Sequence, residues 1–309
     1  MDSVKKRSIL RSILMDWQLY LLLVPGLVYL LLFKYWPMYG ITIAFKDYSI
    51  LRGVADSPWV GIRNFVALFD MYGFLSAVKN TFLISFKKVL YGFPTGPILA
   101  ILINEIFNRR VKKVVQTVVV LPNFISWVVI SGLCYAIFSP SIGVVGNIAR
   151  TLGYQGETLN LLTNRDTFQG FLVGTAIWKT MGWSSIIYLS AITGIDPQLY
   201  EAAVVDGAGR LKQIWHITLP GIQSTIVIML ILRLGHVLEV GFDQVYVLNN
   251  SLVNDVADII DTYVYRIGVE QAKYHYGAAA GLFKSLVAMV MVFSVNMLAR
   301  RLEPDSALW

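Results

Sequence analysis

Long apolar stretches, each near the length that crosses a lipid bilayer, recur along this 309-residue chain. A membrane-spanning helix needs roughly 20 mostly apolar residues, because the hydrocarbon core offers no water to unpaired backbone groups. Six stretches approach that length, at 17–33, 81–103, 114–138, 168–192, 222–248 and 277–298. The sequence therefore predicts an all-α, polytopic membrane protein with six transmembrane helices.

The composition supports this prediction and excludes several other classes. Hydrophobic residues make up 56% of the chain and charged residues 15%, whereas a soluble domain has about 25% charged residues. Disorder, a collagen-like fold and a soluble nucleic-acid-binding domain are therefore excluded. The one cysteine, Cys134, leaves no disulfide framework and no multi-cysteine metal site. We predict no metal and no cofactor in this chain.

The distribution of Lys and Arg predicts the orientation, because cytoplasmic loops carry an excess of both. The cations gather in alternate connecting segments, at Lys5, Lys6, Arg7, Arg11, Arg109, Arg110, Lys112, Lys113, Arg210, Lys212, Arg300 and Arg301. Both termini are then cytoplasmic, with an N-terminal segment 1–16 and a tail 300–309. Residues 34–80 form an external loop, which we expect to hold short strands or an amphipathic surface helix. Residues 81–299 form a five-span core.

The first apolar stretch is predicted to be retained as a span. A cleaved signal peptide would show a small-x-small site after its apolar region, but the sequence continues FKYWPMYG. Aromatic residues at a helix end are typical of an interfacial anchor.

Sequence motifs for common enzymatic chemistry are absent. The chain has no G-x-x-x-x-G-K-[ST] segment, so we do not expect it to hydrolyse ATP. Its three histidines lack H-E-x-x-H spacing, and G-x-S-x-G is missing. The sequence therefore predicts a protein that is not an enzyme.

One polar segment, residues 194–221, interrupts the predicted core. Asp196 and Pro197 suit the N-cap and first turn of a helix, and Gly207 and Gly209 permit a sharp turn. A second short helix at about 210–217 is expected to end before the Leu-Pro step. The segment is thus predicted to be a compact helix–turn–helix.

This segment resembles the EAA loop of ABC importer permeases, whose pattern is EAA, three residues, G, nine residues, I-x-L-P. Every spaced position is met, by Glu201, Ala202, Ala203, Gly207, Ile217, Leu219 and Pro220. The stretches FKYWPMYGITIAFKDYS and WVGIRNF also look like the carbohydrate-uptake class, in its polysaccharide-fragment branch. The resemblance implies the type I importer (MetI-like) fold, with cytoplasmic EAA coupling helices, in a bacterial inner membrane.

The resemblance also implies partners. These are a second permease subunit, more in keeping with a heterodimer than a homodimer, two ATPase subunits that bind ATP and Mg, an external solute-binding protein and the surrounding membrane lipid. The EAA segment would dock on an ATPase subunit through Glu201, Ala202, Ala203, Asp206, Gly207, Ala208, Ile217, Leu219 and Pro220. Small alanines permit close approach, and carboxylates offer charge-assisted contacts.

Ionisable residues inside the predicted spans suggest a substrate path, since such residues usually face a bundle interior. On one continuous fifth helix, Arg233, His236, Glu239 and Asp243 would fall within an arc of roughly 120°. Lys179 lies in the fourth span near Trp178 and Trp183, and aromatic faces suit sugar rings. Together the cations favour an acidic oligosaccharide of alginate or pectin type.

Three alternatives remain open at this level, one of them a membrane-embedded enzyme or scaffold, which would need no ATPase partner. The cations, including Lys87, Lys88 and Lys284, can instead pair internally or extend to the membrane interface. A secondary ion-coupled transporter could use Glu239 as its carboxylate, although it would need broken helices in repeated halves, which the sequence does not reveal. A co-purifying ATPase subunit would distinguish the importer from this alternative.

Overall fold

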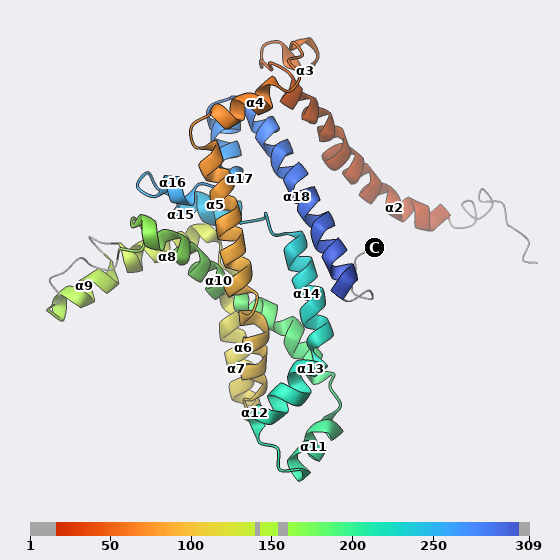
Figure 1. Cartoon of the computed structure of the whole chain (residues 1–309), viewed down its shortest axis with the longest axis vertical. Helices are drawn as coiled ribbons and strands as arrows, with labels where there is room; N and C mark the ends of the chain where they lie inside the picture. Colours follow the sequence, from red (N-terminus) through yellow and green to blue (C-terminus); the bar gives the residue numbers. More distant parts are fainter. Residues whose placement is uncertain (1–16, 140–142, 154–159, 303–309) are drawn as a thin grey trace, which may run out of the picture.

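The computed structural model describes residues 17–139, 143–153 and 160–302. These residues are largely helical, and the only extended pairing among them is an isolated antiparallel bridge between Lys46 and Trp59. The helices form an elongated bundle with α4 (Arg63–Asp70) near one end and α11 (Pro197–Val205) at the other (Figure 1). The all-α prediction is confirmed.

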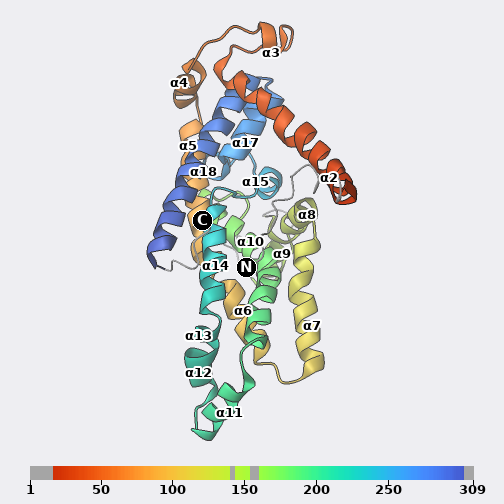
Figure 2. The same cartoon turned by 90° about the vertical axis from the view of Figure 1, so that its right-hand side faces the viewer.

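The N-terminal helix is longer than predicted. It runs without interruption through α2 (Trp17–Leu30), a π-helical turn (Leu31–Tyr35) and a 3₁₀ stretch (Trp36–Phe45). Pro37 does not stop it, because it occupies the first turn of the 3₁₀ stretch, where its missing N–H costs nothing. The loop predicted to begin at residue 34 therefore begins after Phe45. In Figures 1 and 2, α2 leaves the bundle and stands apart from it.

The predicted external loop contains helices rather than strands. These are α3 (Gly53–Asp56) and the amphipathic α4, which buries Asn64 and Leu68. Asn64 Nδ2 donates to the carbonyls of Ala44 and Lys46, at 2.9 Å each. The expected surface helix is thus present, but the strands are not, since this one side chain satisfies the carbonyls that a strand partner would have paired.

The next helical stretch begins at Phe74, seven residues before the predicted start of the second span. It consists of α5 (Phe74–Lys87), a π-helical turn (Lys88–Gly92) and α6 (Thr95–Asn104). The long helix α10 (Arg165–Thr193) covers the predicted fourth span, and α18 (Tyr274–Leu302) covers the sixth. Because α18 continues to Leu302, the predicted tail at 300–309 starts inside a helix. Residues 1–16 and 303–309 lie outside the described residues.

The predicted third span is not one straight helix. It divides into α7 (Arg109–Val120) with a 3₁₀ turn (Leu121–Phe124), and α8 (Trp127–Phe138), and the two parts are bent by 102°. Pro122 is the second residue of the 3₁₀ turn, and the Ser126 hydroxyl caps a new helix by accepting from the Val129 amide at 3.3 Å. The break therefore has a local cause in the sequence.

The predicted fifth span is also broken. Its helix, α14 (Gln223–Gly235), ends at Gly235, and an irregular segment follows at 236–241. Gly241 adopts a φ of +98°, which favours glycine. Short elements then lead to α18, namely α15 (Phe242–Leu248), α16 (Asn254–Ala257), α17 (Ile260–Val264) and a π-helical turn (Tyr265–Glu270). The single helix predicted at 222–248 is wrong.

By length and composition, three described helical stretches can cross a membrane, at Trp17–Phe45, Phe74–Asn104 and Tyr274–Ser294. The number rises to five if each bent pair, Arg109–Phe124 with Trp127–Phe138 and Arg210–Gly221 with Gln223–Gly235, crosses as one span. The helix α10 is long enough but is not among them, because side chains such as Gln169 and Lys179 lower its hydropathy. A multi-pass membrane protein is supported, and the count of six spans stays a prediction.

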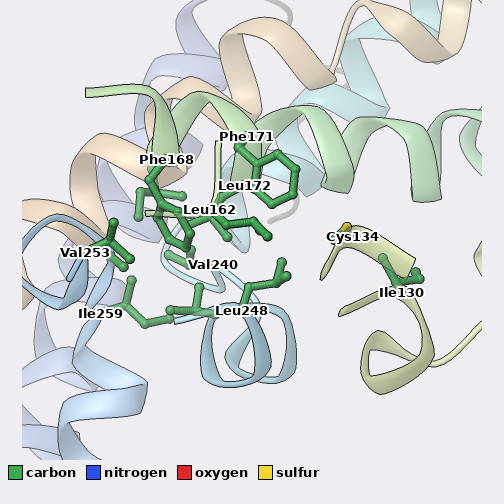
Figure 3. Close-up of a cluster of buried hydrophobic side chains, with 13 residues drawn as sticks. Ile130, Cys134, Leu162, Phe168, Phe171, Leu172, Val240, Leu248, Val253 and Ile259 are labelled. Atoms are coloured by element: carbon green, nitrogen blue, oxygen red, sulfur yellow. The ribbon is translucent and has the colours of Figure 1, made fainter. Parts of the chain in front are cut away.

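Three apolar clusters hold the described chain together, and two of them involve the short elements between α14 and α18. One joins α5, α8 and α10 to the segment around α15, through side chains such as Ile84, Ile130, Phe168 and Val245 (Figure 3). The other joins the α4 end to α18 through Leu68, Phe74, Tyr263 and Ala279. Both clusters bury the short elements between α14 and α18, so these elements belong to the bundle and are not a free loop.

Candidate functional site

The segment 196–221, here called the EAA hairpin, forms the end of the bundle opposite α4 (Figure 1). Its first arm is α11, and Asp196 caps it by accepting a hydrogen bond from the Gln198 amide at 2.9 Å. The arm ends at a turn where Gly207 has a φ of +73° and the Ala208 amide donates to the Ala203 carbonyl at 2.8 Å. The predicted first helix and turn are confirmed.

The second arm is longer than predicted. It passes through α12 (Arg210–Gln213), a π-helical turn (Ile214–Thr218) and α13 (Leu219–Gly221). The helix was expected to end before Leu219, but the wider π turn accommodates Pro220, whose ring would clash with an ordinary helical carbonyl. The arm then bends by 58° into α14. The second arm is therefore joined to α14 through the single residue Ile222.

Contacts within and beside the hairpin fix its shape. The Tyr200 and Thr218 hydroxyls lie 3.0 Å apart and join the two arms. Arg210 donates to Glu105 at 2.6 Å, and its guanidinium lies 4.0 Å from the Phe107 ring centroid. These contacts attach the hairpin to the end of α6.

Most of the motif residues face outward. No residue of α11 is buried; Glu201, Ala202, Asp206, Gly207 and Pro220 are exposed, and Ala203, Ala208, Ile217 and Leu219 are half-buried. Large apolar side chains lie exposed beside them, with 88% exposure at Val205, 74% at Leu211 and 67% at Trp215. An apolar surface of this kind is typical of a protein-binding site.

A cavity of about 340 Å³ lies in the middle of the bundle, beside the break in the fifth span. It is enclosed by α10, α14, the π-helical turn after α5 and the segment 236–241. Its lining includes Lys88, Trp127, Tyr188, Arg233, Glu239 and Gln244. The cavity, here called the central cavity, therefore combines two basic side chains, one carboxylate and three aromatic rings, the third being that of Phe93.

Lys88 anchors the irregular wall of this cavity. Its buried ammonium donates to the Val240 carbonyl at 2.6 Å and to Gln244 Oε1 at 2.5 Å. The Gln244 amide in turn donates to the Leu172 carbonyl at 2.6 Å and to the Thr175 hydroxyl at 2.9 Å. Segment 236–241 has turn-type backbone bonds, such as the one from the Glu239 amide to the His236 carbonyl at 3.0 Å, and the bonds through Lys88 and Gln244 attach it to α10.

Relatives share this architecture along nearly the whole chain. A family described as the binding-protein-dependent transport system inner membrane component matches residues 92–306, which include the EAA hairpin and most of the central-cavity lining. This chain belongs to that family.

Two relatives from Bacillus subtilis (strain 168) are each 43% identical. Protein LplB aligns over 94% of this chain and 91% of its own length, and the polygalacturonan/rhamnogalacturonan transport system permease protein YteP over 96% and 92%.

Solved structures agree with this assignment. The permease resembles a chain of a bacterial alginate ABC transporter in complex with an alginate pentasaccharide-bound periplasmic protein, with a TM-score of 0.86 and 41% identity. That alignment covers 96% of this permease and 98% of the other chain. A second structure, of an ABC transporter that imports the acidic polysaccharide alginate, gives a TM-score of 0.87 and 42% identity over 96% and 99%.

The structure brings together only part of the predicted substrate path. Arg233 and Glu239 both line the central cavity of the permease. His236 lies 3.1 Å from Glu239 but is largely exposed, and Asp243 is in the first turn of α15. The predicted continuous polar face is wrong, because the helix ends at Gly235. Arg233 and Glu239 instead lie on opposite sides of the helix break at Gly235.

Lys179, Trp178 and Trp183, which the sequence placed on the substrate path, lie in other environments. The Lys179 ammonium donates to the carbonyls of Pro122, Asn123 and Ile125, at 3.3, 2.9 and 2.5 Å, across the break in the third span. Trp183 packs edge-on against Phe124 at 6.0 Å, and Trp178 lines a separate, mostly apolar cavity of about 960 Å³. These residues do not line the central cavity.

Internal pairing also accounts for two other intramembrane cations. Lys87 donates to Gln169 at 2.8 Å, and Lys284 to Asp261 at 2.5 Å. By contrast, sequence reasoning gave no role to Trp127 or Gln244, and for Lys88 it offered only internal pairing or the membrane interface, whereas all three line the central cavity. The available signal was a lysine inside an apolar stretch, but the sequence did not indicate its partner.

Proposed function

We propose that this permease imports fragments of an acidic polysaccharide, of alginate or pectin type, through the central cavity. The observation that carries the proposal is that Lys88, Arg233 and Trp127 all line that cavity. Cations suit uronate carboxylates, and an aromatic face suits a sugar ring. Relatives whose names specify alginate or polygalacturonan transport support the same substrate class.

The proposal includes the remaining parts of the machine. A second, related permease chain completes the pore, two separate ATPase subunits bind ATP and Mg, and an external protein delivers the substrate. Both termini lie in the cytoplasm, and so does the EAA hairpin. Its exposed residues Glu201, Ala202, Asp206 and Gly207, with the half-buried Ala203, would then contact an ATPase subunit.

Coupling follows from the continuity between the hairpin and the cavity wall. The second arm of the hairpin passes through Gly221 into α14, and α14 ends at Arg233 and Gly235 beside the central cavity. A movement of the hairpin on ATP binding would displace α14 and change access to the cavity. Such alternating access is a population shift driven by different contacts in two states.

Uptake by the reconstituted complex tests the substrate class. Arg233→Gln removes a cavity charge and should raise the half-saturating concentration of a galacturonate trisaccharide roughly tenfold, as expected for losing one hydrogen bond to a charged group. Uptake of a neutral trisaccharide should change less. Arg63→Gln, at an exposed residue of α4, is the matched control. Equal losses for both sugars would contradict the proposed acidic substrate.

Ion-coupled secondary transport was the other candidate. The breaks at 125–126 and 236–241 and the Glu239 carboxylate in the cavity are features that such a transporter would share. Membership of the binding-protein-dependent family decides against it. Uptake that continues with ATP after ion gradients are collapsed would confirm this decision.

A further inference from the structure

A second polar cavity, of about 200 Å³, lies apart from the central cavity. Six of its lining side chains carry the argument, namely Tyr246, Asn249, Asn254, Thr262, Arg266 and Glu270. They come from α15, the loop after it, α16 and the helical stretch 260–270. In Figure 1 these elements lie between the fifth-span break and the α4 end, away from the EAA hairpin. This cavity is here called the Tyr246 pocket.

One wall of the pocket is an aromatic ring held in a fixed orientation. Tyr246 is 45% exposed and stacks on Phe242, with centroids 5.2 Å apart and planes 16° apart. Tyr265 meets it edge-on at 5.1 Å, and the Tyr246 hydroxyl donates to Glu270 at 3.4 Å. Because its neighbours already hold the ring, little conformational entropy is lost when a ligand packs on it.

The opposite wall consists of amides and a guanidinium. Asn254 Oδ1 accepts from Asn249 Nδ2 at 2.8 Å and from Arg266 Nη1 at 3.4 Å. Asn249 Oδ1 is enclosed and has no donor among the described residues. A buried acceptor without a donor is unfavourable, and a ligand hydroxyl that reached it would relieve this cost.

The charges of the pocket indicate that hydroxyl groups, and not carboxylates, of a ligand would contact its polar wall. The Arg266 guanidinium already pairs with Asp258, whose side chain is 4% exposed, so the positive charge is compensated. Glu270 adds a negative charge at the rim and would repel a carboxylate placed beside it, so a uronate ring would enter with its hydroxyl groups toward the polar wall and its carboxylate directed away from Glu270. Neutral hydroxyls, which both donate and accept, match this mixture of amide, guanidinium and carboxylate groups.

We infer that the Tyr246 pocket is a subsite for a single pyranose ring, bound by its face on Tyr246 and by its hydroxyls to the polar wall. This inference rests on the proposed polysaccharide transport. The volume corresponds to six or seven water molecules at roughly 30 Å³ each, which suits one ring and not a longer fragment. With the proposed orientation, the pocket lies on the external side and would hold one sugar unit while its neighbour enters the central cavity.

Cysteine protection tests this subsite directly. Ser251 lines the pocket, whereas the adjacent Leu252 is exposed and does not line it. In a Cys134→Ser background, the assembled permease–ATPase complex would carry either Ser251→Cys or Leu252→Cys and react with a maleimide. Saturating galacturonate trisaccharide should slow labelling severalfold at 251 and leave 252 unchanged. Equal rates with and without sugar at 251, or equal slowing at both positions, would overturn the inference.

Uptake measurements separate this inference from the proposed function. Tyr246→Ala removes the ring face and should raise the half-saturating trisaccharide concentration roughly tenfold, while Tyr246→Phe keeps the face and should change it little. Assembled complex and basal ATP hydrolysis would be measured for both variants to exclude misfolding. If the unaltered complex takes up no galacturonate trisaccharide, the proposed function fails; normal uptake by Tyr246→Ala overturns only the subsite.

Discussion

At the residue scale, two lysines in this permease, the buried Lys88 and the half-buried Lys179, hold broken helices in place. Lys88 reaches Val240, and Lys179 reaches the carbonyls around Asn123. Carbonyl groups at a helix break have no helical partner, and leaving them unpaired away from water costs free energy. An ammonium with three donors satisfies several at once. Each lysine therefore makes an irregular backbone possible inside the bundle.

Lys88→Met should destabilise the assembled complex and abolish uptake, because it leaves the Val240 carbonyl and Gln244 Oε1 without their donor. An unsatisfied buried group costs about 1–3 kcal/mol, so the thermal midpoint of the detergent-solubilised complex should fall. Lys87→Met is the matched control, since Lys87 is only half-buried and donates to Gln169 alone. Equal midpoints for the two variants would show that Lys88 does not anchor segment 236–241.

Lys179→Met should reduce the amount of assembled complex without changing its choice of sugar. The three carbonyls at 122–125 lose their shared donor, whereas the central cavity keeps its charges. The measurement is the ratio of acidic to neutral trisaccharide uptake, normalised to complex in the membrane. A selective loss of the acidic sugar would instead return Lys179 to the substrate path.

At the element scale, the EAA hairpin depends on one turn. Gly207→Val should uncouple ATP hydrolysis from substrate, because a β-branched residue is strained at a φ of +73°. Gly209→Ala is the matched control, since Gly209 has an extended φ of −68° and open space at its Cβ position. Substrate-stimulated ATP hydrolysis in the reconstituted complex distinguishes the two. Full stimulation in Gly207→Val would exclude this turn as part of the coupling element.

Charge on the first arm of the hairpin gives a second prediction at this scale. Glu201 is exposed, and no hydrogen bond or ion pair joins its side chain to the other described residues. Glu201→Lys should therefore leave the fold intact and weaken ATPase docking by reversing a charge at the proposed interface. Co-purification of the ATPase subunit, measured across salt concentrations, checks this. An unchanged yield of ATPase would place the interface elsewhere.

At the scale of the whole molecule, one chain leaves much apolar surface uncovered. Every side chain of α2 is exposed, and α2 stands apart from the bundle in Figures 1 and 2. Lipid covers part of such a surface, and a second permease chain would cover part of the rest. The intact complex in mild detergent should therefore contain two permease chains, which native mass measurement can count. A stable monomer that transports sugar would contradict this.

The sequence by itself determined the helical class, the approximate apolar stretches and the first arm and turn of the EAA hairpin. Each of these depends on short-range properties, such as apolar run length, a cap at Asp196 and a glycine at 207. Even the breaks have local signals in Pro122 and Gly241. These features can be predicted from the sequence because the residues that cause each of them lie close together along the chain.

Only the tertiary structure decided which polar groups meet. Lys88 and Val240 are 152 positions apart, and Lys179 and Pro122 are 57 apart. Helical periodicity gives the angle between side chains only along an unbroken helix. The predicted arc from Arg233 to Asp243 was therefore wrong, because the helix ends at Gly235. The central cavity and the Tyr246 pocket exist because packing returns separate segments to one place, and the free energy of that packing depends on partners that no local pattern specifies.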